Sequence, residues 1–198
     1  MSKIAIVPIV AAASLLALMP AAQAQGTPTV NLGGPVVAGV CLFSREAVLS
    51  GSKVAISSAE RIKQITAEAQ AEVDGQRRPV DAEIAALRTQ AGKMTPDQIR
   101  AQQQALSAKL APIQTLADQR QREIEKTRSD ALATISAQLQ PLLAAAYGQK
   151  GCGLLFDRNT VLGGNYANDL TAAVIAALDA KLTAIPIQRV TLPPAAKR

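Results

Sequence analysis

The sequence predicts an α+β fold, mostly α, in which a long antiparallel coiled-coil hairpin arm projects from a small β-rich body. Three observations in the 198-residue chain predict it. A narrow apolar stripe runs through residues 57–147. One turn motif, AGKMTPDQIR, interrupts that stripe near its middle. Two short apolar runs typical of buried strands, GVCLFS and GLLFD, flank the stripe and supply the body.

The stripe is narrow because its apolar residues recur mostly at steps of three or four along otherwise polar helices. Such a stripe favours packing of one helix on another rather than burial in a globule. Residues 44–146 contain no aromatic residue, so Ala, Leu and Ile must fill the contact. The two helices should have about 35 and 50 residues, or roughly 50 and 75 Å at 1.5 Å per residue.

The turn motif predicts the tip of the arm, near residues 92–96. Gly92 can end the outgoing helix, and Pro96 is tolerated at the first position of the returning one. Thr95 is a suitable N-cap, and Gln98 stands three residues later, which is the spacing of a capping box. We therefore expect Lys93 and Met94 at the end of the arm farthest from the body.

Two interior prolines predict a hinge in the arm. Pro79 and Pro112 stand at similar distances before and after the tip, so an antiparallel hairpin places them at nearly the same height. Each removes a backbone hydrogen bond and favours a kink. A shared bend and two independent kinks, or a true break in a shorter bundle, remain open alternatives.

The first 24 residues read as a secretory signal peptide, with a positive start at Lys3, an apolar run, and a small-residue cleavage site at AAQA. A membrane anchor is the alternative, but the run is short and contains two prolines. Residues 25–38 should be a flexible leader. Residues 39–56 and 148–190 should form the body, and 191–198 a disordered tail, although an edge strand over 185–192 is also possible.

Several functional classes lack support in the sequence. The chain has no His, and its two cysteines lack the spacing of a redox or zinc motif. Asp157 has no partner base or nucleophile, and the Gly-rich stretches lack phosphate-loop spacing. Asp169 is better explained as the N-cap of a body helix. We therefore expect no enzyme activity, no metal and no cofactor.

The formal net charge of +6 is mild, and it favours anionic surfaces over nucleic acid in a chain without an aromatic platform. The distal arm, residues 77–109, has six basic and three acidic residues, which gives it 6 − 3 = +3. Client or anionic-surface contact is one interpretation of this region, and solvated helix surface is the other. The candidate contact residues are Arg77, Arg78, Arg88, Lys93, Met94, Arg100 and Lys109.

Four segments occur in an order that resembles the Skp/OmpH family of periplasmic chaperones for outer-membrane proteins. GVCLFSREAVLSGSKVA leads from a strand into helix, and KMTPDQ forms the turn of the hairpin. LLFDRNTVL supplies a second strand that ends in Asp. NDLTAAVIAALD is similar to the family's final helix through Asp169, Leu170 and Thr171. The resemblance covers roughly residues 37–182.

The resemblance implies a homotrimer whose three arms enclose unfolded outer-membrane β-barrel proteins and prevent their aggregation without ATP. It also implies a soluble periplasmic protein after signal cleavage, and possible contact with anionic lipid or lipopolysaccharide. Two other functions stay open. One is a coiled-coil structural or adaptor protein of the cell envelope, and the other is a binder of lipopolysaccharide or another anionic polymer.

The family-like body also bears on the two cysteines. Cys41 lies in the first strand segment and Cys152 just before the second, so a disulfide between them is a candidate in an exported chain. Two buried free thiols are the alternative, because Cys packs well in a core.

Overall fold

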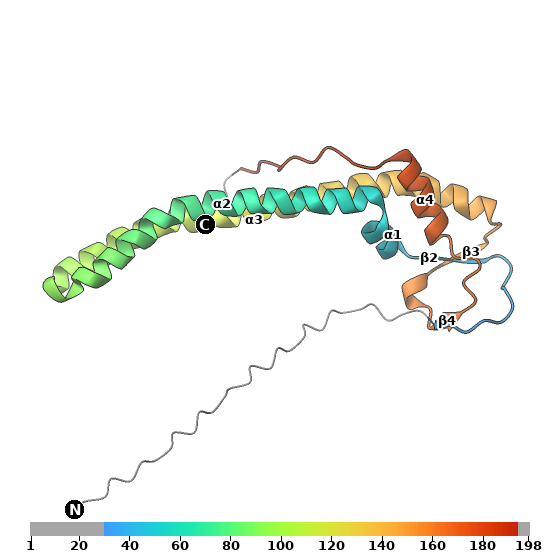
Figure 1. Ribbon diagram of the computed structural model, residues 1–198, viewed down its shortest axis with the longest axis horizontal. Helices are drawn as coiled ribbons and strands as arrows, with labels where there is room; N and C mark the ends of the chain where they lie inside the picture. The colour runs from blue at the N-terminus through green and yellow to red at the C-terminus, as the bar shows by residue number, and fades with distance from the viewer. Residues whose placement is uncertain (1–29, 194–198) are drawn as a thin grey trace, which may run out of the picture.

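The structure, a computed structural model, describes residues 30–193. The expected signal peptide (1–24), the start of the leader and residues 194–198 lie outside this range. Within it, the chain forms a long two-helix arm and a small body at one end (Figure 1). The helices are α1 (Arg45–Gly51), α2 (Lys53–Gln90), α3 (Pro96–Gln149) and α4 (Thr171–Lys181), with short 3-10 turns η1 (Ala91–Lys93) and η2 (Arg158–Thr160).

The arm begins earlier than the sequence suggested. α1 starts after Ser44, whose side chain accepts the backbone N–H of Ala47. The chain then turns at Ser52, and α2 starts at Lys53 rather than near residue 57. The backbone N–H of Lys53 is satisfied at 2.8 Å by the carboxylate of Asp179 in α4. The start of the arm is therefore set by a long-range contact with the body.

The tip is closed by a complete capping box. Thr95 Oγ1 accepts the Gln98 N–H at 3.3 Å, and Gln98 Oε1 accepts the Thr95 N–H at 2.8 Å. Pro96 is the first residue of α3, where its missing N–H costs nothing. Gly92 lies inside η1 without a positive φ, and a Cβ there would meet no atom within 4 Å. The reversal therefore rests on Thr95, Pro96 and Gln98, and does not require glycine at position 92.

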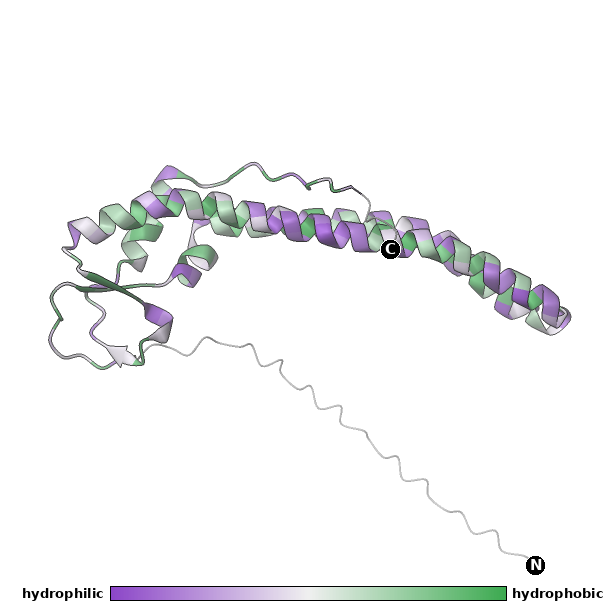
Figure 2. Cartoon of the chain, turned by 180° about the vertical axis from the view of Figure 1, so that it is seen from behind, coloured by the Kyte–Doolittle hydropathy of each residue, from purple (hydrophilic) through white to green (hydrophobic). Residues whose placement is uncertain are grey.

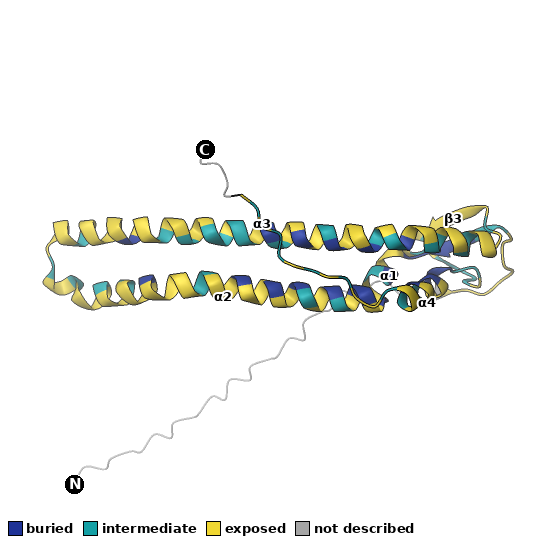
Figure 3. Ribbon diagram, turned by 90° about the horizontal axis from the view of Figure 1, so that it is seen from above, coloured by how far each residue is buried: buried dark blue, intermediate teal, exposed yellow. Residues whose placement is uncertain are grey.

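The two long helices pack through a seam of mostly small and aliphatic side chains. Figure 3 shows the buried positions along both helices. The buried apolar members are Ile62, Ile65, Ala69 and Val80 of α2, and Leu106, Ala131, Ile135 and Leu139 of α3. The buried seam is sparse in its middle, where polar Glu123 and Thr127 are buried instead. A hairpin packed this thinly gains most of its burial near the body.

The main core lies where the base of the hairpin meets α1, α4 and strand β2 (Val40–Phe43). Its fully or nearly buried members are Cys41, Phe43, Val48, Val54, Ile135, Leu139, Leu170, Val174 and Leu178. β2 pairs in parallel with β3 (Leu154–Asp157), with Val40 opposite Leu154. The two strands thus join the segments before and after the arm at its base.

A second parallel pair changes the expectation for the leader. β1 (Val30–Asn31) pairs with β4 (Gly163–Gly164), so the last part of the leader is bound to the body instead of free. α4 starts at Thr171, with Leu170 in the N-cap position. Asp169 lies one residue earlier, and its Oδ1 accepts the Thr171 N–H at 2.8 Å while Oδ2 pairs with Arg158. Asp169 therefore still satisfies an orphan N–H of the first turn.

The C-terminal residues differ most from the expectation. Residues 185–192 add no edge strand, and residues 191–193 do not separate from the fold. Instead, residues 183–193 run back along the arm in an extended conformation (Figure 1), and we call this segment the strap. We expected the body to extend through residue 190. It ends instead near α4.

Pro79 and Pro112 lie at the same height of the arm, where both line one open cavity of about 480 Å³. α2 and α3 continue through them as unbroken helices. The arm curves toward its tip (Figure 1). The placement fits a shared bend, and hinge motion at this height stays a prediction. Among residues 30–193, no helix has the length and apolarity needed to cross a membrane.

Candidate functional site

The distal arm carries three basic side chains that no acidic residue of the described range 30–193 neutralises. Each acid of residues 77–109 forms an ion pair with a basic residue; the pairs are Arg77 with Asp81, Arg100 with Asp97, and Lys109 with Glu83. Arg78, Arg88 and Lys93 are exposed and have no ion pair within residues 30–193. The net +3 of this region is therefore presented by these three side chains, with Met94 half-buried beside Lys93 at the tip.

An apolar groove that sequence reasoning missed lies near the base of the arm. It has a volume of about 680 Å³ and is lined by α1, α2 and α3, chiefly by Leu49, Ala55, Ala59, Ile62, Ala67, Ala131, Leu132 and Ile135. Leu132 is 42% exposed there. Lys63 and Arg128 stand at its margins. The sequence signal for this groove is a set of alanines beside the apolar stripe, because their short side chains leave space between the helices.

The body has an open apolar edge at β3. The sequence predicted a buried strand here, and this was wrong: Leu154, Leu155 and Phe156 are all exposed, Leu154 by 58% and Phe156 by 47%, because no described element of the single chain covers β3. Figure 2 draws the β2–β3 strand pair in dark green, the hydrophobic end of its scale. β2 is paired on its other side, since Leu42 exchanges backbone hydrogen bonds with Asn168 and Leu170. β3 has no second neighbour among the described residues, which leaves a sheet edge able to accept another strand.

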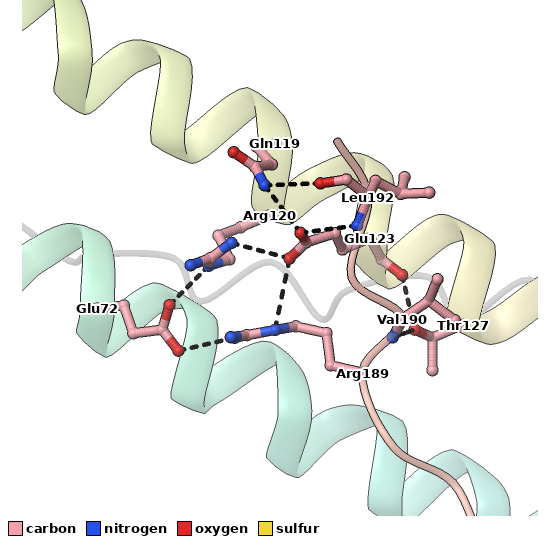
Figure 4. A network of polar contacts seen from close by, with 8 residues as sticks. All are labelled: Glu72, Gln119, Arg120, Glu123, Thr127, Arg189, Val190 and Leu192. Atoms are coloured by element: carbon pink, nitrogen blue, oxygen red, sulfur yellow. Dashed lines mark hydrogen bonds and ion pairs between the residues drawn. The ribbon is translucent and has the colours of Figure 1, made fainter. Parts of the chain in front are cut away.

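A polar cluster joins the strap to both helices of the arm (Figure 4). Arg189 of the strap pairs with Glu72 of α2 at 2.8 Å and with Glu123 of α3 at 3.4 Å. Arg120 of α3 bridges the same two carboxylates, at 2.6 Å and 2.9 Å. Two acids and two bases therefore alternate in a ring that crosses the hairpin seam where its apolar packing is sparse.

Glu123 is the most enclosed member of this ring, with 1% of its side chain exposed. Burial opposes its ionisation, but hydrogen bonds from the Leu192 N–H, Gln119 and Arg120 outweigh it and hold the pKa of Glu123 below its ordinary value of 4.5. Hydrogen bonds from Arg189 and Arg120 also lower the pKa of Glu72. A buried carboxylate with this many donors is ionised and paired. The strap therefore supplies groups that take the place of water around the Glu123 carboxylate.

Attachment of the strap should therefore weaken in acid. The ionised carboxylate of Glu123 is favoured in the folded state, so stability contributed by it is present above pH 4.5 and is lost as pH falls through its lowered pKa. We expect hydrogen exchange at the Val190 and Leu192 amides to accelerate below about pH 4.5, after correction for intrinsic rates.

Glu123→Gln should remove most of this pH dependence. Glu125→Gln is the matched control, because Glu125 lies on the same helix but is exposed and, among residues 30–193, its carboxylate accepts a side-chain hydrogen bond from Gln121 alone. An equal loss of the pH dependence in both variants would show that the titration belongs to the general charge of the arm.

Cys41 and Cys152 are joined by a disulfide in the structure, with their Cα atoms 5.7 Å apart. The bond lies beside the β2–β3 pair at the base of the arm. Within the described range there is no group of three or more His, Cys, Asp or Glu side chains placed to hold a metal ion. The expected site residues are thus spread over the tip, the middle and the base of the arm instead of converging on one pocket.

Fold and surfaces together define a class of protein: a small body that carries a long helical hairpin with exposed cationic and apolar patches. The sequence model of the family described as Outer membrane protein (OmpH-like) matches residues 39–178. The chain belongs to this OmpH-like family. It is also similar to a solved structure from Caulobacter crescentus CB15, provisionally described as an outer membrane chaperone (OmpH-like).

That similarity has 33% sequence identity and a TM-score of 0.70, and it covers 80% of this chain and 94% of the other. A search of curated proteins found no match. The family and the fold confirm the predicted resemblance and the predicted α+β hairpin architecture.

Proposed function

We propose that this protein is a chaperone of the periplasm that holds unfolded outer-membrane β-barrel proteins and prevents their aggregation without ATP. The observation that carries the proposal is an OmpH-like chain whose long arm offers weak, dispersed contacts along its surface. Unfolded barrel proteins expose alternating apolar residues and unpaired strand edges. A holdase must cover many such sequences and release them again.

The contact surfaces of the arm suit that requirement. The apolar groove at the base can accept aliphatic side chains, and Arg78, Arg88 and Lys93 can attract acidic ones. Each exposed charge contact contributes only about 0.2–1 kcal/mol, so no single contact traps the client. Many such contacts on one arm still lower the concentration of free unfolded chain, which slows aggregation.

Assembly into a homotrimer is part of the proposal. A two-stranded sheet is marginal alone, and the apolar β3 edge remains uncovered in the single chain. Association of bodies through this edge would bury Leu154 and Phe156 and bring several arms to one side. The enclosed space between them would hold the client. This edge supports self-association, and the number three comes from the family resemblance.

A dilution-refolding experiment tests the function. A denatured outer-membrane barrel protein is diluted with and without the protein, and light scattering is followed. We expect suppression once the assembled protein exceeds the client. Unchanged scattering at that ratio would exclude the holdase function.

The contribution of the distal arm is tested by neutralising its three free cations. The triple variant Arg78→Gln, Arg88→Gln, Lys93→Gln should weaken client binding by about 1 kcal/mol, or roughly five-fold, and more at low salt. The matched control removes the same charge near the body, in the triple variant Arg45→Gln, Lys150→Gln, Lys181→Gln. Equal weakening in both variants would assign the effect to overall charge.

Recognition of an anionic polymer such as lipopolysaccharide is the second candidate, because the same three cations are exposed and have no acidic partner in the described part of the chain. This function predicts binding of lipopolysaccharide that falls steeply with salt and does not affect scattering of the unfolded barrel protein.

A further inference from the structure

The strap shows how the arm holds a polypeptide segment in an extended conformation. From residue 185 to 189 its side chains alternate between half-buried (Ile185, Ile187, Arg189) and exposed (Pro186, Gln188). None of residues 183–193 is fully buried. The segment therefore lies on a surface of the arm and is not part of its core.

Most polar contacts to the strap are made with its main chain. Side chains of α2 and α3 supply all five: Ser57 donates to the Thr183 carbonyl, Arg61 to the Ile187 carbonyl, Gln119 to the Leu192 carbonyl, and Thr127 and Glu123 accept from the N–H groups of Val190 and Leu192. Their lengths lie between 2.9 and 3.3 Å. Contacts to the main chain do not depend on the sequence of the bound segment.

Only one strap side chain makes ion pairs with the arm. Arg189 reaches Glu72 and Glu123, which supply the acidic end of the surface. Beside them, Ile185, Pro186, Ile187 and Val190 leave a cavity of about 250 Å³ against α3. The surface therefore selects for an extended segment with one basic residue among aliphatic ones, and it leaves the apolar side imperfectly filled.

We propose that this surface of α2 and α3 is a binding site for extended polypeptide segments that carry a basic side chain, and that the strap occupies it in cis until such a segment displaces it. The family match ends at residue 178, before the strap begins, so the family model does not cover the strap. The identity of the competing segment, part of an unfolded client, rests on the proposed chaperone function. The binding site itself does not.

The first experiment uses full-length protein and a fluorescein-labelled peptide with the strap sequence TAIPIQRVTLP. While the strap occupies the site, the apparent affinity for the peptide is the intrinsic affinity multiplied by the fraction of sites left free. Weakening the strap should raise that fraction and therefore the apparent affinity. We expect Arg189→Ala protein to bind the peptide about tenfold more tightly than the unsubstituted protein. Lys181→Ala is the matched control, since Lys181 is exposed and has no ion pair among residues 30–193.

Specificity is read from two further substitutions. Replacing Arg by Ala in the peptide should abolish the gain in peptide affinity. Adding Glu123→Gln to the Arg189→Ala protein should reduce that gain. Replacing Arg by Lys in the peptide should restore part of it, because Lys keeps the charge without the forked geometry. If Arg189→Ala loosens the strap by hydrogen exchange but binds peptide no more tightly, the strap is only a brace and the proposal is wrong.

The second experiment adds unfolded outer-membrane barrel protein and follows hydrogen exchange at Val190 and Leu192. Client binding should accelerate exchange at both amides. If aggregation is suppressed while both amides stay protected, the client does not displace the strap, and the chaperone function stands. If aggregation is not suppressed, the chaperone function fails, and the peptide titration alone decides whether the surface binds extended segments.

Discussion

Phe156→Asp is expected to convert the assembled protein into monomers. Phe156 is 47% exposed on the unpaired edge of β3, and the proposed assembly covers it. Loss of a buried aromatic costs about 3 kcal/mol per interface, or roughly a hundredfold in the dissociation constant, and a buried unpaired carboxylate costs more. Sedimentation velocity at micromolar protein measures the change directly.

The control for this prediction is Leu162→Asp. Leu162 is 97% exposed and lies between η2 and β4, outside strand β3. We expect this variant to stay assembled. A monomeric unsubstituted protein would contradict both the assembly and the enclosed space, whereas assembly that survives Phe156→Asp would place the interface elsewhere.

Removal of the disulfide should give the largest loss of stability. Cys41 and Cys152 are 111 positions apart, so the bond closes a long loop that includes the whole arm. The chain-entropy estimate for such a loop is about 4 kcal/mol. We expect the Cys41→Ala, Cys152→Ala variant to lose about that much free energy of unfolding in urea, monitored by circular dichroism.

Reduced, unsubstituted protein is the matched comparison, because it lacks the bond but keeps both side chains. It should unfold close to the double variant. If native protein from the periplasm reacts with two equivalents of alkylating reagent, the cysteines are free thiols there and no such difference is expected.

The local features of the arm could be predicted because they depend on residues close in sequence. Thr95, Pro96 and Gln98 specify the tip through hydrogen bonds across three positions. The apolar stripe specifies the helix pairing through its period. Gly92 was assigned a role that the turn does not need, since proximity to a helix end does not establish a left-handed backbone.

The strap could not be predicted because its contacts are remote and mostly made with main chain. Arg189 lies 117 positions from Glu72, and no local pattern relates the two. Glu123 reads as one more charged residue on a polar helix face, yet it is among the most buried side chains of the protein. The β1–β4 pair was equally invisible, because Gly163 and Gly164 carry no side chains to form a strand pattern.

The Cys41–Cys152 bond makes a covalently closed loop of α1 and the arm, because one bonded residue precedes α1 and the other follows α3. A protease that cuts once near the tip would leave both halves attached to one body, and the cut chain would separate only after reduction. Tension applied at the tip would likewise be carried through both helices to the same covalent anchor. The parts of the body before Cys41 and after Cys152 thereby lie outside the path of a load on the arm.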